Sequence, residues 1–244
     1  MEKPLALTPE DGQAMVDAAR RHNRILMVGH LLIYHPAIRA IKELIDKGEL
    51  GRVEYLYSNR LSMGKIRREE NALWSFAPHD ISILLLLTGQ TPMQATAVGG
   101  TYLQPNIADV TVSNLLFASG TRAHIFVSWL HPYKEQRLVV IGSKKMVVFE
   151  DSRATDKVMI YDKEIAWRNG NYEVSQPKGT PVTFAADEPL RMECQEFIDC
   201  VEQRRSPRTP GEDGVNVLRV LEASQRSLEM NGAPVQITAP LRVG

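Results

Sequence analysis

The chain has 244 residues, of which 43% are hydrophobic and 24% charged, which excludes disorder as the default and is typical of a globular protein. Lysine plus arginine and aspartate plus glutamate number 29 each, so no long-range field favours nucleic acid or an anionic membrane. The longest apolar run, at residues 81–87, is far shorter than the ~20 residues of a membrane-spanning helix. The N-terminus has no secretion signal. We therefore expect a cytoplasmic protein whose partner is a small molecule or another protein.

The two cysteines, Cys194 and Cys200, stand six residues apart in a predicted helix. This spacing places them on different faces of the helix, so we expect no disulfide between them. The sequence contains no CxxC motif and no cluster of cysteine and histidine. It therefore predicts buried, inert thiols and no metal site, with a redox or metal-binding role as the alternative.

The first part of the chain predicts a helix, a strand and a second helix. Residues 8–23 begin with Thr8 as the N-cap, Pro9 at the first helical position and two acids in the first turn. The apolar run ILMVGHLL, residues 25–32, suits a strand that is buried on both faces. Residues 35–48 have helical periodicity, which ends at Gly48.

From Arg52 onward the pattern changes to alternating runs separated by turn residues, namely VEYLYSNRL, MQATAVGGTYL, VTVSNLLF, RAHIFVSWL, RLVVIG, KMVVFED and KVMIYD. Several connections are too short for a crossover helix, so we expect a mainly antiparallel sheet. Helices are predicted at residues 72–87, 188–205 and 213–231, and a long irregular loop at residues 169–187. Helices on one face of an open, mainly antiparallel sheet make an α+β fold.

The predicted helix near residue 80 places polar side chains among apolar neighbours, because Ser75, His79 and Ser82 fall at i, i+4 and i+7. Pro78 allows a second interpretation, in which the helix begins there, Ser75 leaves the stripe and His79 lies at the positive helix end. That position keeps an imidazole neutral and suits a general base. The alternative is a core histidine bonded to a carbonyl. Asp80 is interpreted as a helix-start acid or an ion-pair partner.

The order of several motifs resembles the Gfo/Idh/MocA family of oxidoreductases. The motifs are EKP, a helix, a strand ending at Gly29, YHPAIRAIKELIDKGELG, GRV entering a sheet, and LWSFAPHDISILLLLTG. With GKIRREENALWSFAPHD and SWLHPYK, they are most similar to the branch that oxidises UDP-linked N-acetyl amino sugars and their uronates. The resemblance implies that residues 1–31 are the last elements of a Rossmann-like domain. Residues 32–244 would form a substrate-binding and oligomerisation α+β domain.

By this resemblance, Lys3 is the active-site lysine that holds the reacting hydroxyl, and His79 is the acid/base that accepts its proton. Glu2, Lys3 and Pro4 would contact the cofactor, NAD or NADP, which takes the hydride. Many relatives have aspartate four residues before the histidine, where this chain has Ser75. No GxGxxG occurs in the sequence, so we expect a dinucleotide-binding segment of about 100 residues to be missing before Glu2. Alone, the chain is expected to bind NAD(P) weakly or not at all.

Candidate substrate contacts lie in three other places. Lys65 and Arg67, with Arg68, form a basic cluster that could bind a pyrophosphate or a carboxylate, a solvated loop being the alternative. Trp129 and His131 end a strand where a ring could stack on a sugar or base, or else pack in the core or an interface.

Tyr34, with His35 next to it, follows the strand ending near Gly29 and could point into the cleft.

Three hypotheses follow for the function. The first is an NAD(P)-dependent dehydrogenase that oxidises a ring hydroxyl of a sugar or UDP-sugar. The second is a non-catalytic sugar-binding or oligomerisation module derived from such an enzyme, and the third is an enzyme whose nucleotide-binding half comes from another polypeptide or was cut away. Apolar residues at alternate positions of RLVVIG and KMVVFED would meet water on the sheet face without helices. We therefore predict a homo-oligomer formed through the sheet faces.

Overall fold

A nine-stranded sheet dominates the computed structural model, which describes residues 1–175 and 177–238. The sheet contains β1 Val53–Met63, β2 Gln94–Gly100, β3 Val110–Leu116, β4 Arg122–Ser128, β5 Leu130–Gly142, β6 Lys145–Glu150, β7 Val158–Asp162, β10 Thr180–Pro181 and β11 Val235–Gln236. Their order is β10-β7-β6-β5-β1-β4-β3-β2-β11. β1 and β4 pair in parallel, and the other neighbours in the sheet run antiparallel. The predicted open, mainly antiparallel sheet is confirmed.

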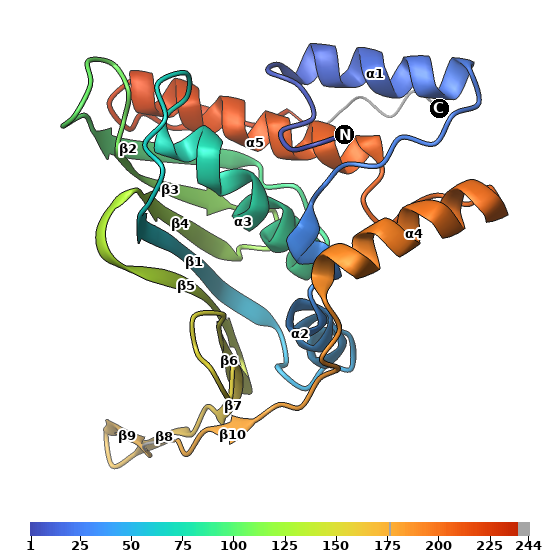
Figure 1. Ribbon diagram of the computed structural model, residues 1–244. Coiled ribbons are helices and arrows are strands. Elements are labelled where there is room, and N and C mark those ends of the chain that lie inside the picture. The colour runs from blue at the N-terminus through green and yellow to red at the C-terminus, as the bar shows by residue number, and fades with distance from the viewer. Residues whose placement is uncertain (176, 239–244) are drawn as a thin grey trace.

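Five α-helices and one 3-10 helix accompany the sheet in the described residues: α1 Pro9–Arg21, η1 Leu31–Tyr34, α2 Pro36–Asp46, α3 Ala72–Thr88, α4 Pro189–Gln203 and α5 Gly211–Glu229. α3 and α5 lie over one face of the sheet, and α1 lies beside α5 (Figure 1). Local sequence explains the helix ends. The Thr8 and Asn71 side chains accept hydrogen bonds from backbone N–H groups in the first turns of α1 and α3, and Gly89 ends α3 in the left-handed conformation.

One hydrophobic core lies between the sheet and its helices. Ile81 and Leu84 of α3 pack with Leu221 of α5 against sheet residues such as Leu56 and Ile125, all at most 1% exposed. Burying one such aliphatic side chain contributes about 1.5–3 kcal/mol. The core therefore fixes α3, with the polar side chains it carries, on the sheet.

The strand register divides the sheet into two faces. Arg60 on β1 bonds to Asp80 on α3, which identifies the helix-covered face. Tyr57 pairs with His124 and Val139, and Val139 pairs with Val148, so these residues share the opposite face. In the described part of the chain no helix covers that face (Figure 1).

Two predicted segments differ from the structure. The expected strand at residues 25–32 is wrong, because Met27 makes only an isolated bridge to Pro210 and a 3-10 helix begins at Leu31. A strand needs a ladder of backbone partners, and this segment finds single ones at Met1 and Thr209.

The predicted loop at residues 169–187 is wrong in part, because β9 Asn171–Val174 pairs with β8 Ile165–Arg168 as a hairpin and β10 joins the sheet. Asn169 and Gly170 both have positive φ, as a tight hairpin turn requires. Residue 176 of this segment lies outside the described residues.

The structure also tests the predictions for the two cysteines and for a membrane-spanning helix. Cys194 and Cys200 are both free thiols, and burial was predicted correctly for Cys200 but not for Cys194, which is exposed. Over the residues that the structure describes, no helix combines the length and apolar character needed to cross a bilayer.

Candidate active site

α3 carries the predicted acid/base histidine in its interior. The helix starts at Ala72 and continues through Pro78, so the interpretation that places His79 at a helix start is wrong. The Asn71 N-cap and the buried residues before Pro78 hold the first turns, although proline cannot bond to the carbonyl of Trp74. Ser75, His79 and Ser82 therefore remain on one stripe of the helix.

The imidazole of His79 has no hydrogen-bond partner among the described residues, and its Nδ1 is buried. Burial, together with the positive charges of Arg60, Lys3 and His30, lowers the pKa of His79 to about 2. The ring is therefore neutral, as predicted, but burial rather than a helix terminus is the cause. An unpartnered neutral imidazole can accept a proton from a bound hydroxyl.

Lys3 lies beside the same stripe. Its Nζ donates a hydrogen bond of 2.7 Å to the backbone carbonyl of Ser75. Burial lowers the pKa of Lys3, while Glu70 opposes that shift. The structure thus brings Lys3 and His79 together and orients the lysine through a main-chain oxygen.

The remaining predicted cofactor residues flank Lys3. Glu2 is exposed, Pro4 is half-buried, and the peptide bond between Lys3 and Pro4 is cis. The backbone N–H of Gly29 donates to the carbonyl of Met1 at 2.7 Å, which fixes the start of the chain beside the segment that precedes η1.

Two charged residues near this site, Arg60 and Asp80, were not predicted to take part in it. Asp80 is fully buried, and it accepts hydrogen bonds from Ser58 at 2.6 Å and from Arg60 at 2.8 Å and 3.1 Å. The interpretation of Asp80 as an ion-pair partner is therefore confirmed. The Arg60 charge that this pair fixes lowers the pKa values of both His79 and Lys3.

His30 was also missed, because its apolar neighbours in ILMVGHLL read as a strand. It is 1% exposed, and neither ring nitrogen has a hydrogen-bond partner in the part of the chain that the structure describes. Burial and the Lys3 charge lower the pKa of His30 to about 4. A histidine within an apolar run was the signal that could have identified it.

The predicted basic cluster divides into one residue near the site and two solvated ones. Arg67 is half-buried, pairs with Glu70 at 3.6 Å and lowers the pKa of Lys3. Lys65 and Arg68 are exposed. Arg67 therefore lies close enough to Lys3 to act on it electrostatically.

The aromatic predictions need correction. Trp129 is fully buried and donates its indole N–H to Asp109 at 2.6 Å, so its ring cannot stack on a substrate. Tyr34 is also fully buried, and its hydroxyl bonds to Thr209 at 2.9 Å, so it anchors η1 instead of facing the cleft. His131 packs edge-on against Tyr133 and bonds to its carbonyl.

The neighbouring His35 caps α2 by accepting the backbone N–H of Ala37 at 3.1 Å. It therefore has a structural role at a helix start rather than a place in the cleft.

Comparison with known proteins adds an independent line of information. Residues 38–148 match the family described as the GFO/IDH/MocA C-terminal domain. The chain is 26% identical to the UDP-N-acetylglucosamine 3-dehydrogenase of Acidithiobacillus ferrooxidans, over 92% of this chain and 68% of the relative. It is 27% identical to the inositol 2-dehydrogenase of Rhizobium meliloti, over 93% of this chain and 70% of the relative.

Solved structures agree on the fold. The structure of the Acidithiobacillus ferrooxidans dehydrogenase superposes with a TM-score of 0.80 at 23% identity, over 94% of this chain and 71% of that chain. Levoglucosan dehydrogenase in complex with NADH gives a TM-score of 0.77 at 20% identity, over 97% of this chain and 72% of that chain. A 2,7-anhydro-N-acetylneuraminate hydratase from Mediterraneibacter gnavus is matched over only 42% of its length.

Proposed function

Because this chain belongs to the Gfo/Idh/MocA family of oxidoreductases, we propose that it forms the substrate side of an NAD(P)-dependent dehydrogenase that oxidises a ring hydroxyl of a sugar. The observation that carries the proposal is the pairing of Lys3, held at the Ser75 carbonyl, with the unpartnered imidazole of His79. Removal of a hydride from an alcohol carbon requires a group that takes the hydroxyl proton.

In the proposed reaction, Nζ of Lys3 donates a hydrogen bond to the oxygen of the reacting hydroxyl. His79 accepts the proton of that hydroxyl, and the lysine charge stabilises the negative charge that develops on the oxygen. A pKa of about 2 makes His79 a weak base before substrate binds. The charge that develops on the oxygen beside it favours the protonated ring and raises that pKa during the reaction.

The residues present fit the nicotinamide end of the cofactor. The buried, unpartnered Nδ1 of His79 and the half-buried ammonium of Lys3 provide a polar site at which substrate and nicotinamide could meet. Glu2, Lys3 and Pro4 would hold the cofactor there, and NAD or NADP would supply the hydride acceptor. No GxGxxG turn for the dinucleotide phosphates occurs in the sequence.

We propose a nucleotide-linked amino sugar as substrate. The relatives named UDP-N-acetylglucosamine 3-dehydrogenase and inositol 2-dehydrogenase both act at one carbon of a hydroxylated ring. Arg67, half-buried and near Lys3, could meet the pyrophosphate of a UDP-sugar, whereas inositol has no group for it. This favours the UDP-sugar over the cyclitol.

Calorimetry on the 244-residue chain tests the proposal. UDP-N-acetylglucosamine should bind, and Arg67→Gln should weaken its binding about tenfold, as the loss of one charged hydrogen bond implies. In an assay for NADH formation with the same sugar, His79→Gln should lower the rate by about 10²–10⁴-fold. His22→Gln, at an exposed histidine, is the control and should change neither quantity.

The results separate the alternatives. Sugar-nucleotide binding that is unchanged by substitutions at Lys3 and His79 would indicate a non-catalytic sugar-binding module, because the proposed active site would then not contact the sugar. Failure of the chain to bind UDP-N-acetylglucosamine and inositol alike would remove the proposed substrate class.

A further inference from the structure

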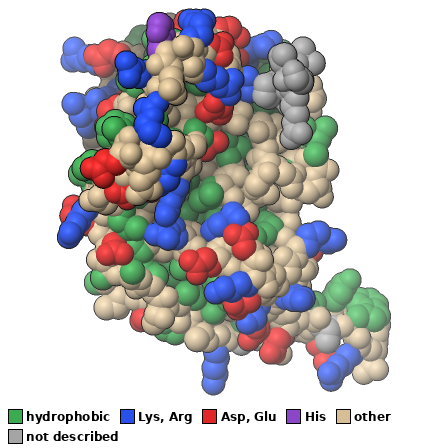
Figure 2. Space-filling view, turned by 90° about the vertical axis from the view of Figure 1, so that its right-hand side faces the viewer, with side chains coloured by type: hydrophobic (Ala, Val, Ile, Leu, Met, Phe, Trp, Pro, Cys, Tyr) green, Lys and Arg blue, Asp and Glu red, His purple; other side chains and the backbone are tan. Residues whose placement is uncertain are grey.

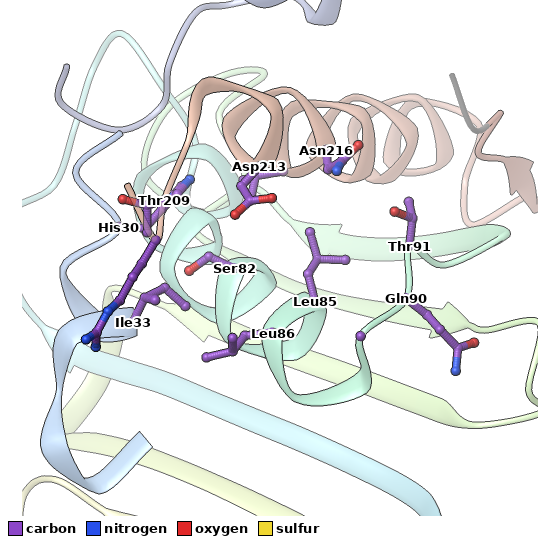
Figure 3. Close-up of a pocket in the computed structure, with 13 residues that line it drawn as sticks. His30, Ile33, Ser82, Leu85, Leu86, Gln90, Thr91, Thr209, Asp213 and Asn216 are labelled. Carbon is purple, nitrogen blue, oxygen red and sulfur yellow. The ribbon is translucent and has the colours of Figure 1, made fainter. Parts of the chain in front are cut away.

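A cavity separate from the Lys3 and His79 pair lies between α3, α5 and the segment before η1. Its volume is about 320 Å³, within the usual range for small-molecule sites. Figure 3 shows Ser82, Leu85 and Leu86 on α3, with the carboxylate of Asp213 pointing from α5 toward them. Neither Lys3 nor His79 lines this space.

The polar groups of the cavity retain hydrogen-bonding capacity. His30 forms part of the wall, and both of its buried ring nitrogens lack a partner among the described residues, which leaves one donor and one acceptor on the neutral ring. Ser82 donates its proton to the carbonyl of His79 at 2.8 Å, so its oxygen can only accept further bonds. A buried histidine without partners is costly unless something else bonds to it.

At the other end of the cavity, Asn216 and Gln90 each form a hydrogen bond through the oxygen of the side-chain amide but not through its NH₂ group. Asn216 accepts from Arg219 at 3.1 Å through its oxygen, and Gln90 accepts from the backbone of Ser119 at 3.3 Å. The NH₂ group of each remains available as a donor. The Asp213 carboxylate makes no side-chain hydrogen bond within the described ranges and adds an acceptor. The residues that line the cavity therefore include both donors and acceptors.

We propose that this cavity binds a small neutral polyol, the ring of a sugar or cyclitol, at a site distinct from the one that holds the reacting hydroxyl. Mixed donors and acceptors suit a ring of hydroxyl groups, each of which both gives and receives a hydrogen bond. The aliphatic side chains of Ile33, Leu85, Leu86 and Val217 line the same space and suit the C–H face of such a ring.

Charge argues against an anionic ligand in this cavity. Asp213 supplies a negative group, and burial together with the charge of Glu212 raises its pKa to about 6. The guanidinium of Arg208, which also borders the cavity, lies 3.7 Å from Glu196 and is partly neutralised by it. A phosphate or carboxylate would therefore face the Asp213 carboxylate with little compensation, whereas a neutral ring does not.

The test adds N-acetylglucosamine, as the probe, to the full chain with isotope-labelled histidines. NMR follows the histidine resonances during this titration. The His30 resonance should shift saturably, with a dissociation constant of about 1 mM or tighter. Asp213→Asn and Asn216→Ala should each weaken this binding about tenfold, a loss of about 1.4 kcal/mol. The matched control is Glu212→Gln, which removes a charge from the same first turn of α5 but does not line the cavity.

Two further measurements make the outcome decisive. Thermal unfolding of each variant identifies a loss of binding that reflects misfolding, because Asp213 also lies in the first turn of α5. His79→Gln should leave the His30 shift intact, and loss of the shift in that variant would place the probe in the active site and overturn the proposal. Absence of any saturable shift of His30 would overturn it as well. None of these results depends on dehydrogenase activity.

Discussion

His30, which is buried, and His79, which is partly buried, should make the stability of the fold depend on pH. The pKa of His30 is lowered to about 4 and that of His79 to about 2, both from an ordinary value of 6.5. Between pH 6.5 and 4 the unfolded chain binds a proton at each site and the folded chain does not. The free energy of unfolding should therefore fall as the pH drops through this window, by up to about 1.4 kcal/mol per pH unit for each histidine.

Urea unfolding across this pH range measures the effect. His30→Gln and His79→Gln should each reduce the change of the unfolding free energy with pH, by up to about 1.4 kcal/mol per pH unit, the contribution of one proton. His22→Gln, at an exposed position, is the control and should leave this pH dependence unchanged. Identical slopes in the wild type and both variants would show that neither ring is kept neutral by the fold.

Among the ion pairs of the described residues, the pair between Arg60 and Asp80 should be the one whose loss costs most stability. Asp80 is fully buried, and its carboxylate is bonded by both Arg60 and Ser58. Asp80→Ala leaves the guanidinium uncompensated and should destabilise the fold by about 3–5 kcal/mol. Glu212→Gln breaks an exposed pair with Arg20 and should cost at most about 1 kcal/mol. Chemical denaturation measures the loss of unfolding free energy in each variant. Equal losses would contradict the conclusion that the buried pair of Arg60 and Asp80 contributes more than the exposed one.

The two candidate catalytic residues came from the sequence by different routes, His79 from its own pattern and Lys3 from a family resemblance. His79 stood out as a polar residue in an apolar helix, and Lys3 was recognised through the EKP motif. The sequence left Trp129 open between a substrate contact and core packing, and it placed Tyr34 in the cleft, because an aromatic side chain has the same local signature in a cleft and in a core. The bond from Lys3 to the Ser75 carbonyl joins groups 72 positions apart and leaves no mark in the sequence.

At the scale of elements, local signals predicted helices better than isolated strands. Thr8 and Asn71 are good N-caps wherever a helix follows, and α1 and α3 formed as expected. The apolar run at residues 25–32 gave no information about its partners, and without a ladder it forms a single bridge. The dipeptide Asn169-Gly170 is a strong hairpin signal, and it accounts for β8 and β9 where a loop was expected.

The cap of α3 gives a prediction at this scale. Asn71 accepts from the backbone N–H of Trp74 at 3.1 Å, and its amide donates to Gln225 of α5 at 2.8 Å. Asn71→Ala removes both bonds and should lower the free energy of unfolding by about 1–2 kcal/mol. Gln225→Ala removes the second bond and an exposed bond from Gln225 to Glu229 but leaves the cap intact, so it serves as the control, with an expected loss of about 1 kcal/mol. Calorimetric unfolding measures both, and a harmless Asn71→Ala would contradict a capping role.

At the scale of the whole molecule, one face of the sheet carries apolar side chains that no helix of the described residues covers. Tyr57 stacks on His124, with ring centroids 5.0 Å apart, and Val112, Val139 and Val148 share that face through the strand register. The hairpin of β8 and β9 adds a second apolar surface that projects as a small lobe at the lower right of Figure 2. Its side chains on one face are Ile165, Trp167, Tyr172 and Val174, all exposed.

The two surfaces favour a symmetric assembly. The hairpin follows β7, near one edge of the sheet, and exposed Val98 lies on β2, near the other edge. A two-fold dimer through the sheet faces would place the same face of both chains in contact. An isolated two-stranded hairpin is marginally stable in water, so a contact with the partner would also stabilise it.

The homo-oligomer therefore remains a prediction that two substitutions can test. Light scattering at micromolar concentration should give at least twice the mass of one chain. Val112→Glu places a charge in the sheet face and should produce monomers, and Trp167→Ser should weaken association by removing the largest side chain of the hairpin. Arg21→Glu, at an exposed position on α1, should leave the mass unchanged. A monomeric wild-type chain would contradict the prediction, and a Trp167→Ser dimer of unchanged affinity would confine the interface to the sheet face.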